Sequence, residues 1–158
     1  MEYREIKKSD DAALADIIRS NLKAHKLDIP GTAYYDHHLD RLSEYYLKDG
    51  SRRFYLVAQK DGAPVGGIGL AELDFFDDCA ELQKLYLADS VKGHGTGYIL
   101  ISMIEEKARE LGYKQIYLET HSNLKAAIHI YEKCGYKEID RPAEAVHGTM
   151  DRFFLKKL

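Results

Sequence analysis

Two hydrophobic periodicities alternate along the chain and divide it into predicted strands and helices. Apolar residues at alternate positions are typical of strands, and apolar residues three or four positions apart are typical of amphipathic helices. The first pattern predicts strands at residues 3–7, 53–59, 65–73, 80–87, 115–120, 136–140 and 150–158. The second predicts helices from the Ser9–Asp10 cap to about residue 25 and over residues 34–48, 98–111 and 123–134.

The order of these elements is strand, two helices, three strands, helix, strand, helix and two strands. This order predicts an α/β fold of the mixed α+β type, in which about four helices cover both faces of a mixed sheet of about seven strands. The length of 158 residues suits one domain, and the sequence contains no repeat or linker. We therefore expect residues 1–158 to form a single domain.

One predicted strand, at residues 65–73, is rich in glycine. Gly66, Gly67 and Gly69 stand in what should be its interior. Glycine weakens a strand interior, so its presence there commonly marks a bulge or the close approach of another backbone. We expect one of these irregularities in this strand.

Composition and charge exclude several classes of protein. The chain is 45% hydrophobic and 31% charged, which indicates a globular protein. A net charge of −3 argues against nucleic acid as the main partner, because affinity for a duplex rests on neutralising phosphates. The charged start, Met1–Glu5, is unlike a signal peptide, and no long apolar run follows. We expect a cytoplasmic protein that does not bind membranes.

The residues that commonly bind metals do not form a recognisable pattern. Cys79 and Cys134 make no disulfide framework and lack the spacing of metal ligands. The histidines lack a motif such as H-E-x-x-H; they include His37, His38, His94, His121, His129 and His147. We expect no metal.

The glycine loop Lys92-Gly93-His94-Gly95-Thr96-Gly97 is the strongest candidate for a binding site. Glycine at alternate positions allows a tight turn and a close approach of the backbone to a ligand. A helix is predicted directly after the loop, and the start of a helix has unpaired N–H groups and a positive dipole end. The loop therefore predicts a site for an anion, best suited to phosphate.

Two common phosphate-binding motifs fit the loop poorly. A Walker A loop requires Gly-Lys-Ser/Thr at its end, where this chain has Gly97-Tyr98-Ile99. The dinucleotide fingerprint requires a third glycine where Tyr98 stands, and its turn follows the strand more closely than this loop does. Glu119, at the end of the next strand, stands where a ribose-binding acid would be expected. A dinucleotide site is therefore the second-ranked interpretation.

The loop and a later segment together resemble the GNAT superfamily of N-acetyltransferases. The family's pyrophosphate loop, Arg/Gln-x-x-Gly-x-Gly/Ala, is similar to Lys92-x-x-Gly95-x-Gly97, with Lys92 in place of the usual residue. Asn123-x-x-Ala126 and the run from Tyr131 to Tyr136 resemble its second cofactor motif. The resemblance implies a mostly antiparallel sheet whose fourth and fifth strands splay apart, and acetyl-CoA as co-substrate held by residues 92–97. Lysine keeps the charge of arginine but lacks its planar fork.

The resemblance also implies roles for residues on both sides of the cofactor. Backbone N–H groups around Leu85, Tyr86 and Leu87 would face the thioester and stabilise the developing oxyanion. Tyr131 matches the family tyrosine near the cofactor sulfur, where a phenol can protonate the departing thiolate. Asn123 would hydrogen-bond the pantetheine arm, and it also suits a helix N-cap.

The acceptor amine needs a base, for which Glu81 is the first candidate. Its position before Lys92 is similar to that of the catalytic glutamate in the histone-acetylating branch of the family. A carboxylate partly removed from water has a raised pKa and can relay a proton through water. Glu72 on the neighbouring strand is the reserve candidate, Glu119 is another possible cleft residue, and a chain of waters is a further alternative.

The sequence therefore predicts an enzyme that moves the acetyl group of acetyl-CoA to a primary amine by direct attack in a ternary complex. The acceptor is a small molecule or a peptide or protein amine, and the sequence does not choose between them. A non-catalytic module that binds acyl-CoA and reports its level is the alternative from another class. A homodimer is compatible with the sequence but no residue indicates one.

Overall fold

The chain folds around a seven-stranded sheet with the strand order β1-β2-β3-β4-β5-β7-β6. The computed structural model describes residues 1–145 and 148–158. The strands are β1 Glu2–Glu5, β2 Phe54–Lys60, β3 Ala63–Leu73, β4 Cys79–Leu87, β5 Gln115–Thr120, β6 Lys137–Ile139 and β7 Arg152–Lys157. The α-helices are α1 Asp11–Ala24, α2 Leu42–Tyr46, α3 Thr96–Glu110 and α4 Lys125–Lys133. The predicted mixed, mostly antiparallel sheet is confirmed.

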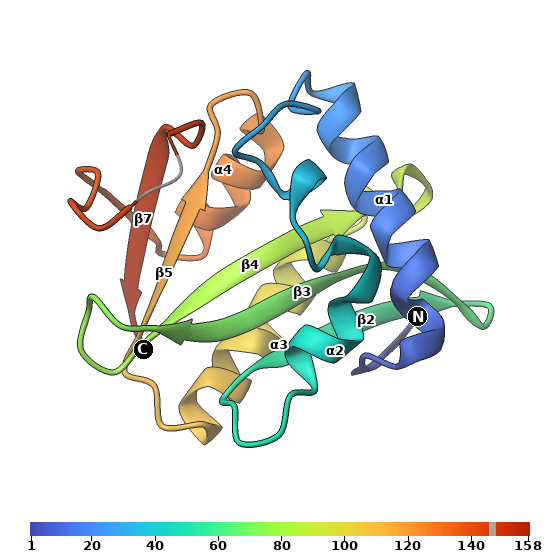
Figure 1. Ribbon diagram of the computed structural model, residues 1–158, viewed down its shortest axis with the longest axis horizontal. Helices are drawn as coiled ribbons and strands as arrows, with labels where there is room; N and C mark the ends of the chain where they lie inside the picture. Colours follow the sequence, from blue (N-terminus) through green and yellow to red (C-terminus); the bar gives the residue numbers. More distant parts are fainter. Residues whose placement is uncertain (146–147) are drawn as a thin grey trace.

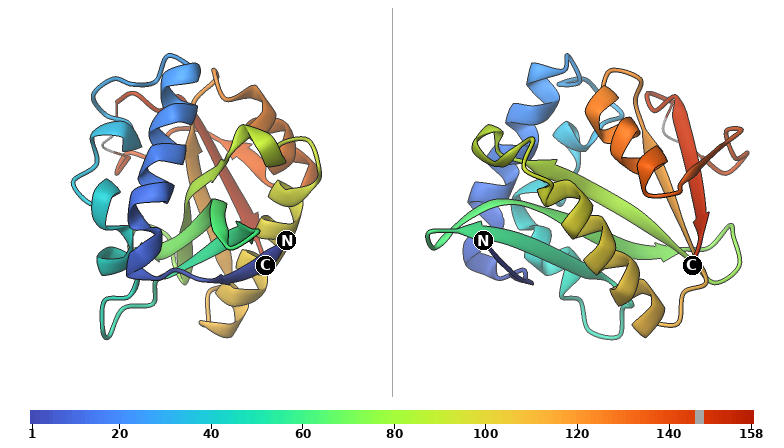
Figure 2. Two further views of the ribbon diagram at one scale, coloured as in Figure 1. Left: turned by 90° about the vertical axis from the view of Figure 1, so that its right-hand side faces the viewer. Right: turned by 180° about the vertical axis from the view of Figure 1, so that it is seen from behind.

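The helices cover the sheet on both faces (Figures 1 and 2). Helices α1 and α2 pack on one face through a cluster that includes Leu14, Ile18 and Tyr46. Helices α3 and α4 pack on the other face through a larger cluster. Burial of these apolar stripes is the main term that stabilises the layers. Among the described residues, no helix combines the length and the apolar character needed to span a bilayer.

The β4–β5 pair is the parallel pair of the sheet, and it separates early. The two strands are in register at Cys79 with Gln115, Ala80 with Ile116 and Glu81 with Tyr117. Strand β4 then runs on to Leu87 and β5 to Thr120 without further pairing between them. The predicted splay of the fourth and fifth strands is therefore confirmed, and it opens the middle of the sheet (Figure 1).

A β-bulge in β4 lies at the start of this opening. The register with β3 passes from Gly69–Gln83 to Gly67–Tyr86, so the extra residue of the bulge is in β4. Lys84 has a φ of 52°, in the left-handed region that a lysine rarely adopts. Bulges of this kind bend a strand and redirect side chains, and here the bulge directs Lys84 toward the opening.

The glycines of β3 make room for the tyrosines that hold the bulge. A Cβ at Gly67 would lie 2.4 Å from Tyr55 Cε1, and a Cβ at Gly69 would lie 2.5 Å from the hydroxyl oxygen of Tyr46. The Tyr55 hydroxyl donates to the carbonyl oxygen of Lys84 at 3.1 Å. The close approach of another backbone that the glycine-rich sequence predicted is confirmed at Gly66, where a Cβ would lie 2.4 Å from the carbonyl oxygen of Tyr86.

The predicted helix over residues 34–48 is wrong in its first half. The structure has short 3₁₀ turns at Ala33–Tyr35 and Leu39–Arg41, and the α-helix covers Leu42–Tyr46. Asp36 lies between the turns, where its carboxylate accepts from the His38 N–H at 3.0 Å. Short polar side chains that bond to nearby backbone compete with a helix, which explains the interruption.

Candidate active site

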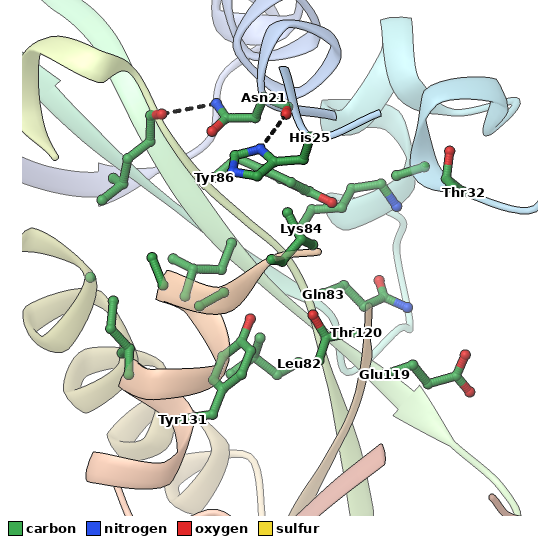
Figure 3. Close-up of a pocket in the computed structure, with 18 of the residues that line it drawn as sticks. Asn21, His25, Thr32, Leu82, Gln83, Lys84, Tyr86, Glu119, Thr120 and Tyr131 are labelled. Carbon is green, nitrogen blue, oxygen red and sulfur yellow. Dashed lines mark hydrogen bonds between the residues drawn. The ribbon is translucent and has the colours of Figure 1, made fainter. Parts of the chain in front are cut away.

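A cleft of about 840 Å³ lies where β4 and β5 separate. It is lined by the end of α1, the segment after it, β4 from Glu81 to Leu87, the glycine loop, the end of β5 and the start of α4. Figure 3 shows side chains from these elements converging on it. Its volume is in the range of small-molecule sites.

The glycine loop forms one end of the cleft and leads into α3. Gly95 is the N-cap of α3 with a φ of 80°, and no side chain caps the helix. A Cβ on Gly93 or Gly95 would have nothing within 4 Å, so the backbone is open to a ligand at both positions. At Gly97 a Cβ would lie 3.1 Å from Ile130 Cδ1, so this glycine allows α3 to pack against α4. The loop thus presents uncapped helical N–H groups to the cleft, as an anion site requires.

The side chains of the loop differ in position. Lys92 lines the cleft and forms an ion pair with Asp89 at 2.7 Å. His94 is exposed and is not among the residues that line the cleft. Thr96 is buried at the first turn of α3 and does line it.

Strand β4 supplies backbone groups to the cleft beyond the bulge. From Leu82 to Leu87 it pairs with β3 on one edge and with no strand on the other. Asn21 of α1 donates to the Leu87 carbonyl oxygen at 2.9 Å and fixes the end of the strand. Leu85, Tyr86 and Leu87 line the cleft.

Glu81 lies in the cleft, at the last position of β4 that pairs with β5. Burial, followed by the negative charge of Glu119, raises the pKa of Glu81 to about 7. A hydrogen bond from Gln83 and the charge of Lys84 act in the opposite direction. At neutral pH this carboxyl group is thus close to half-ionised, as a general base requires.

Tyr131 of α4 faces Glu81's strand from the other side of the opening. The residue is 5% exposed, yet it lines the cleft, and Figure 3 shows its hydroxyl directed into it. No described residue hydrogen-bonds this hydroxyl. Burial raises the pKa of Tyr131 well above the usual value of a phenol, so the group is protonated at neutral pH and able to donate.

An ion pair connects the bulge with the segment after α1. Lys84 Nζ lies 2.7 Å from Asp36 Oδ2, and the two side chains are 11% and 27% exposed. The charge of Lys84 holds the pKa of Asp36 below its usual range despite burial. This pair was not expected from the sequence, because it depends on the bulge and on the broken second helix.

Besides His94, two sequence candidates lie outside the cleft. Glu72 is exposed, pairs with Arg53 at 3.0 Å and does not line the cleft. Asn123 is exposed, and its side-chain amide donates to the His25 carbonyl oxygen at 3.0 Å, which ties the start of α4 to the end of α1. The N-cap of α4 is Leu124 and no side chain caps it. Neither Glu72 nor Asn123 contacts the space that Glu81 and Tyr131 share.

Several cleft residues were not singled out by sequence reasoning. They include Asn21 of α1, His25 at its C-cap, Gln83 of β4 and Thr120 of β5. Asn21 carries the one visible signal, because a polar residue stands there on the otherwise apolar face of the helix. Over residues 1–145 and 148–158, no group of three or more His, Cys, Asp or Glu residues is placed to hold a metal. His147 lies outside these ranges.

Comparison with known proteins places these features in a family. The model of the acetyltransferase (GNAT) family matches residues 17–136. The uncharacterized N-acetyltransferase YjgM of Escherichia coli (strain K12) is 37% identical over 139 residues, which cover 87% of this chain and 82% of that protein.

Solved structures show the same fold. A GNAT-family acetyltransferase from Staphylococcus aureus Mu50 has a TM-score of 0.87 at 23% identity, covering 99% of this chain and 98% of that one. The PaiA N-acetyltransferase of Thermoplasma acidophilum, solved in complex with coenzyme A, has a TM-score of 0.78 at 20% identity, with coverage of 99% and 98%.

Proposed function

The chain belongs to the GNAT family of acetyltransferases and is an acyl-CoA-dependent N-acetyltransferase, and we propose that it acetylates a primary amine by direct attack in a ternary complex. The acyl donor in this proposal is acetyl-CoA, and the acceptor is an amine of a small molecule or peptide. The observation that carries the proposal is the placement of Glu81 and Tyr131 in one cleft, with complementary protonation states.

The residues of the cleft fit acetyl-CoA. Gly93 and Gly95 leave space for a pyrophosphate next to the uncapped start of α3. Lys92 adds a positive charge there, and it would contact the pyrophosphate while also pairing with Asp89. The edge of β4 that faces away from β3 offers amide groups to a pantetheine arm, much as a further strand would pair with it. Asn123 supports this arrangement by joining α4 to α1.

Glu81 acts on the acceptor in the proposed mechanism. The ionised carboxylate takes a proton from the incoming ammonium group through a water molecule, which leaves the amine free to attack. Its pKa of about 7 suits this task, because the group is ionised often enough to accept the proton and basic enough to hold it. Gln83, which hydrogen-bonds both Glu81 and the Tyr46 hydroxyl, keeps the carboxylate in place.

Two sets of groups act on the acetyl donor: the backbone N–H groups near the bulge, and the hydroxyl of Tyr131. Amide groups of residues 85–87 stabilise the charge that develops on the carbonyl oxygen, and they need no reorganisation because the bulge is fixed by Tyr55. The Tyr131 hydroxyl donates a proton to the departing sulfur. Cys134 lies at the end of α4, is not among the cleft-lining residues and has its pKa raised by burial, so no covalent acetyl-cysteine step is proposed.

Ligand-dependent thermal stability tests the donor part of the proposal. A ligand present at about 100 times its Kd stabilises the folded protein by about 2.7 kcal/mol, which corresponds to several degrees in Tm. We expect acetyl-CoA and CoA to raise Tm by this amount, and NAD and ATP to leave it within about one degree. Stabilisation by NAD alone would favour the dinucleotide interpretation, and no stabilisation by acetyl-CoA or CoA would contradict the proposal.

A further inference from the structure

Lys84 is a cation in the same cleft and on the same strand as the candidate base Glu81. Its side chain is 11% exposed, and the bulge directs it toward the opening. Burial and the charge of Glu119 raise the pKa of Glu81 to about 7, and the charge of Lys84 is one of the effects that oppose them. The flexible four-carbon stem of a lysine lets its ammonium group reach carboxylates in several directions. The position of this ammonium group therefore matters for Glu81.

The ion pair with Asp36 fixes the ammonium group on the far side of the bulge. Lys84 Nζ lies 2.7 Å from Asp36 Oδ2. Both ends of the pair are held, because the Tyr55 hydroxyl donates to the Lys84 carbonyl oxygen at 3.1 Å and the His38 N–H donates to Asp36 Oδ1 at 3.0 Å. Figure 3 shows the Lys84 side chain extending from β4 toward the segment that carries Thr32.

Asp36 and Glu81 are near enough to compete for this ammonium group. The charge of Lys84 acts on both carboxyl groups, and after burial and the neighbouring phenols, both carboxylates raise the pKa of Tyr46. Gln83 accepts from the Tyr46 hydroxyl at 2.7 Å and also hydrogen-bonds Glu81. Direct contact with a cation lowers the pKa of a carboxyl group by about 1–3 units. The pKa of Asp36 lies below its usual range despite burial, whereas that of Glu81 stays raised, so Asp36 has the contact.

We propose that Asp36 is a positioning residue for the base: it holds the Lys84 ammonium group away from Glu81 and leaves that carboxylate to the acceptor amine. This inference rests on the proposed role of Glu81. Without the negative charge of Asp36, Lys84 would turn to Glu81. The pair so formed would make Glu81 a weaker base and would put a fixed ammonium group where the ammonium group of the acceptor has to bind.

Other ionisable groups around Glu81 stay the same in the test of this proposal. Those that interact electrostatically with it are Glu119 and Tyr117 of β5, Tyr45 and Tyr46 of α2, and Cys79 of β4. Arg141 acts on Tyr117, and His38 acts on Asp36. Because the variants below alter none of these groups, a change in the ionisation of Glu81 reports on Asp36 and Lys84.

The ionisation of Glu81 is measured directly from the ¹³C shift of its side-chain carboxyl group in protein that carries labelled glutamate, with Glu81→Gln to assign the signal. Asp36→Asn removes the charge and keeps an oxygen to accept from the His38 N–H. We expect the midpoint for Glu81, about pH 7 in the wild type, to fall by at least about one unit in this variant. In the double variant Asp36→Asn/Lys84→Met it should return to about 7 or higher, because the ammonium group is gone.

The rate should follow the ionisation. With 1,4-diaminobutane as acceptor, the rise of kcat/KM with pH should move to lower pH in Asp36→Asn, and the value at pH 8 should fall about tenfold because the base is weaker. Lys84→Met, added to Asp36→Asn, should restore most of it. Asp40→Asn is the matched control, because it breaks the ion pair with Arg19 at 2.8 Å in the same segment but outside the cleft. It should change neither the midpoint nor the rate.

An unchanged midpoint for Glu81 in Asp36→Asn, or a loss of activity that Lys84→Met does not reverse, would overturn the proposal and make Asp36 a structural residue of its segment. Either result would leave the role of Glu81 intact. A midpoint that shifts as expected while the pH dependence of kcat/KM does not follow would support the placement of Lys84 by Asp36 and would contradict the proposed role of Glu81 as base.

Discussion

Replacement of Glu81 by glutamine is expected to lower kcat/KM for the amine at pH 7 by about 100- to 1,000-fold, the range typical of a lost general base. The variant can use only the fraction of the amine that is already unprotonated. For an amine with a pKa of about 10, that fraction is about one in a thousand at pH 7. The change is nearly isosteric, and Glu72→Gln controls for the loss of a strand carboxylate outside the cleft.

The dependence of kcat/KM on pH should differ between the wild type and Glu81→Gln. In the wild type, kcat/KM should rise with pH as Glu81 ionises around pH 7 and then level off, because ionised Glu81 can deprotonate the bound ammonium. In Glu81→Gln it should go on rising to about pH 10, where the amine itself loses its proton. The difference between the two enzymes should therefore shrink as pH rises. Parallel profiles would remove Glu81 from the mechanism and favour a water chain.

Replacement of Tyr131 by phenylalanine is expected to lower kcat about 100-fold while the Kd of acetyl-CoA changes by less than about twofold, because the lost hydroxyl acts on the leaving group. The aromatic ring, which packs against Phe154 in the core, is retained. Steady-state kinetics together with titration of acetyl-CoA separate the two effects. An equal loss of kcat and of affinity would instead indicate that the hydroxyl serves in binding.

Tyr136→Phe is the matched control for this variant. Its ring lies 6.0 Å from that of Tyr131 in the same cluster, but the residue does not line the cleft. It should retain kcat close to the wild-type value. A comparable loss of kcat in Tyr136→Phe would mean that the core around α4, rather than the Tyr131 hydroxyl, determines the rate.

The parts of the fold that depend on local pattern could be predicted from the sequence. Strand β5 was expected at residues 115–120 and lies at Gln115–Thr120. The glycines before α3 were expected to open a helix start, and Gly95 is its N-cap. Such features follow from periodicity and from the backbone freedom of glycine, which act over a few residues. The splayed pair followed from the family resemblance instead.

Features that depend on contacts between distant segments could not be predicted in the same way. The predicted second helix is interrupted at Asp36, whose carboxylate pairs with Lys84 from a strand far along the chain. The bulge at Lys84 depends on glycines of β3 and on tyrosines from two other elements. The hydrogen bond from the Asn123 amide to the backbone of His25 on α1 was likewise not visible in its motif. Local propensity is readily overridden by such tertiary contacts.

The cleft itself shows why candidate acids were hard to rank. Glu72, Glu81 and Glu119 are all glutamates on central strands of the sheet, so the sequence alone does not distinguish them. Only the point at which β4 and β5 separate decides which of them face a ligand. That point follows from strand pairing, and it places Glu81 and Glu119 in the cleft and leaves Glu72 with Arg53.

The central claim, direct transfer from acetyl-CoA to an amine within this cleft, is tested most directly by a single-turnover experiment. Enzyme in excess over acetyl-CoA is mixed with buffer or with 1,4-diaminobutane, and free thiol, acetylated amine and the intact mass of the protein are measured together. We predict that thiol release requires the amine, equals the acetylated amine formed and leaves the protein mass unchanged. Thiol release without amine, with an acetyl group gained by the protein, would contradict direct attack. If the protein binds acetyl-CoA but releases no thiol with any primary amine, it would instead be a non-catalytic acyl-CoA sensor.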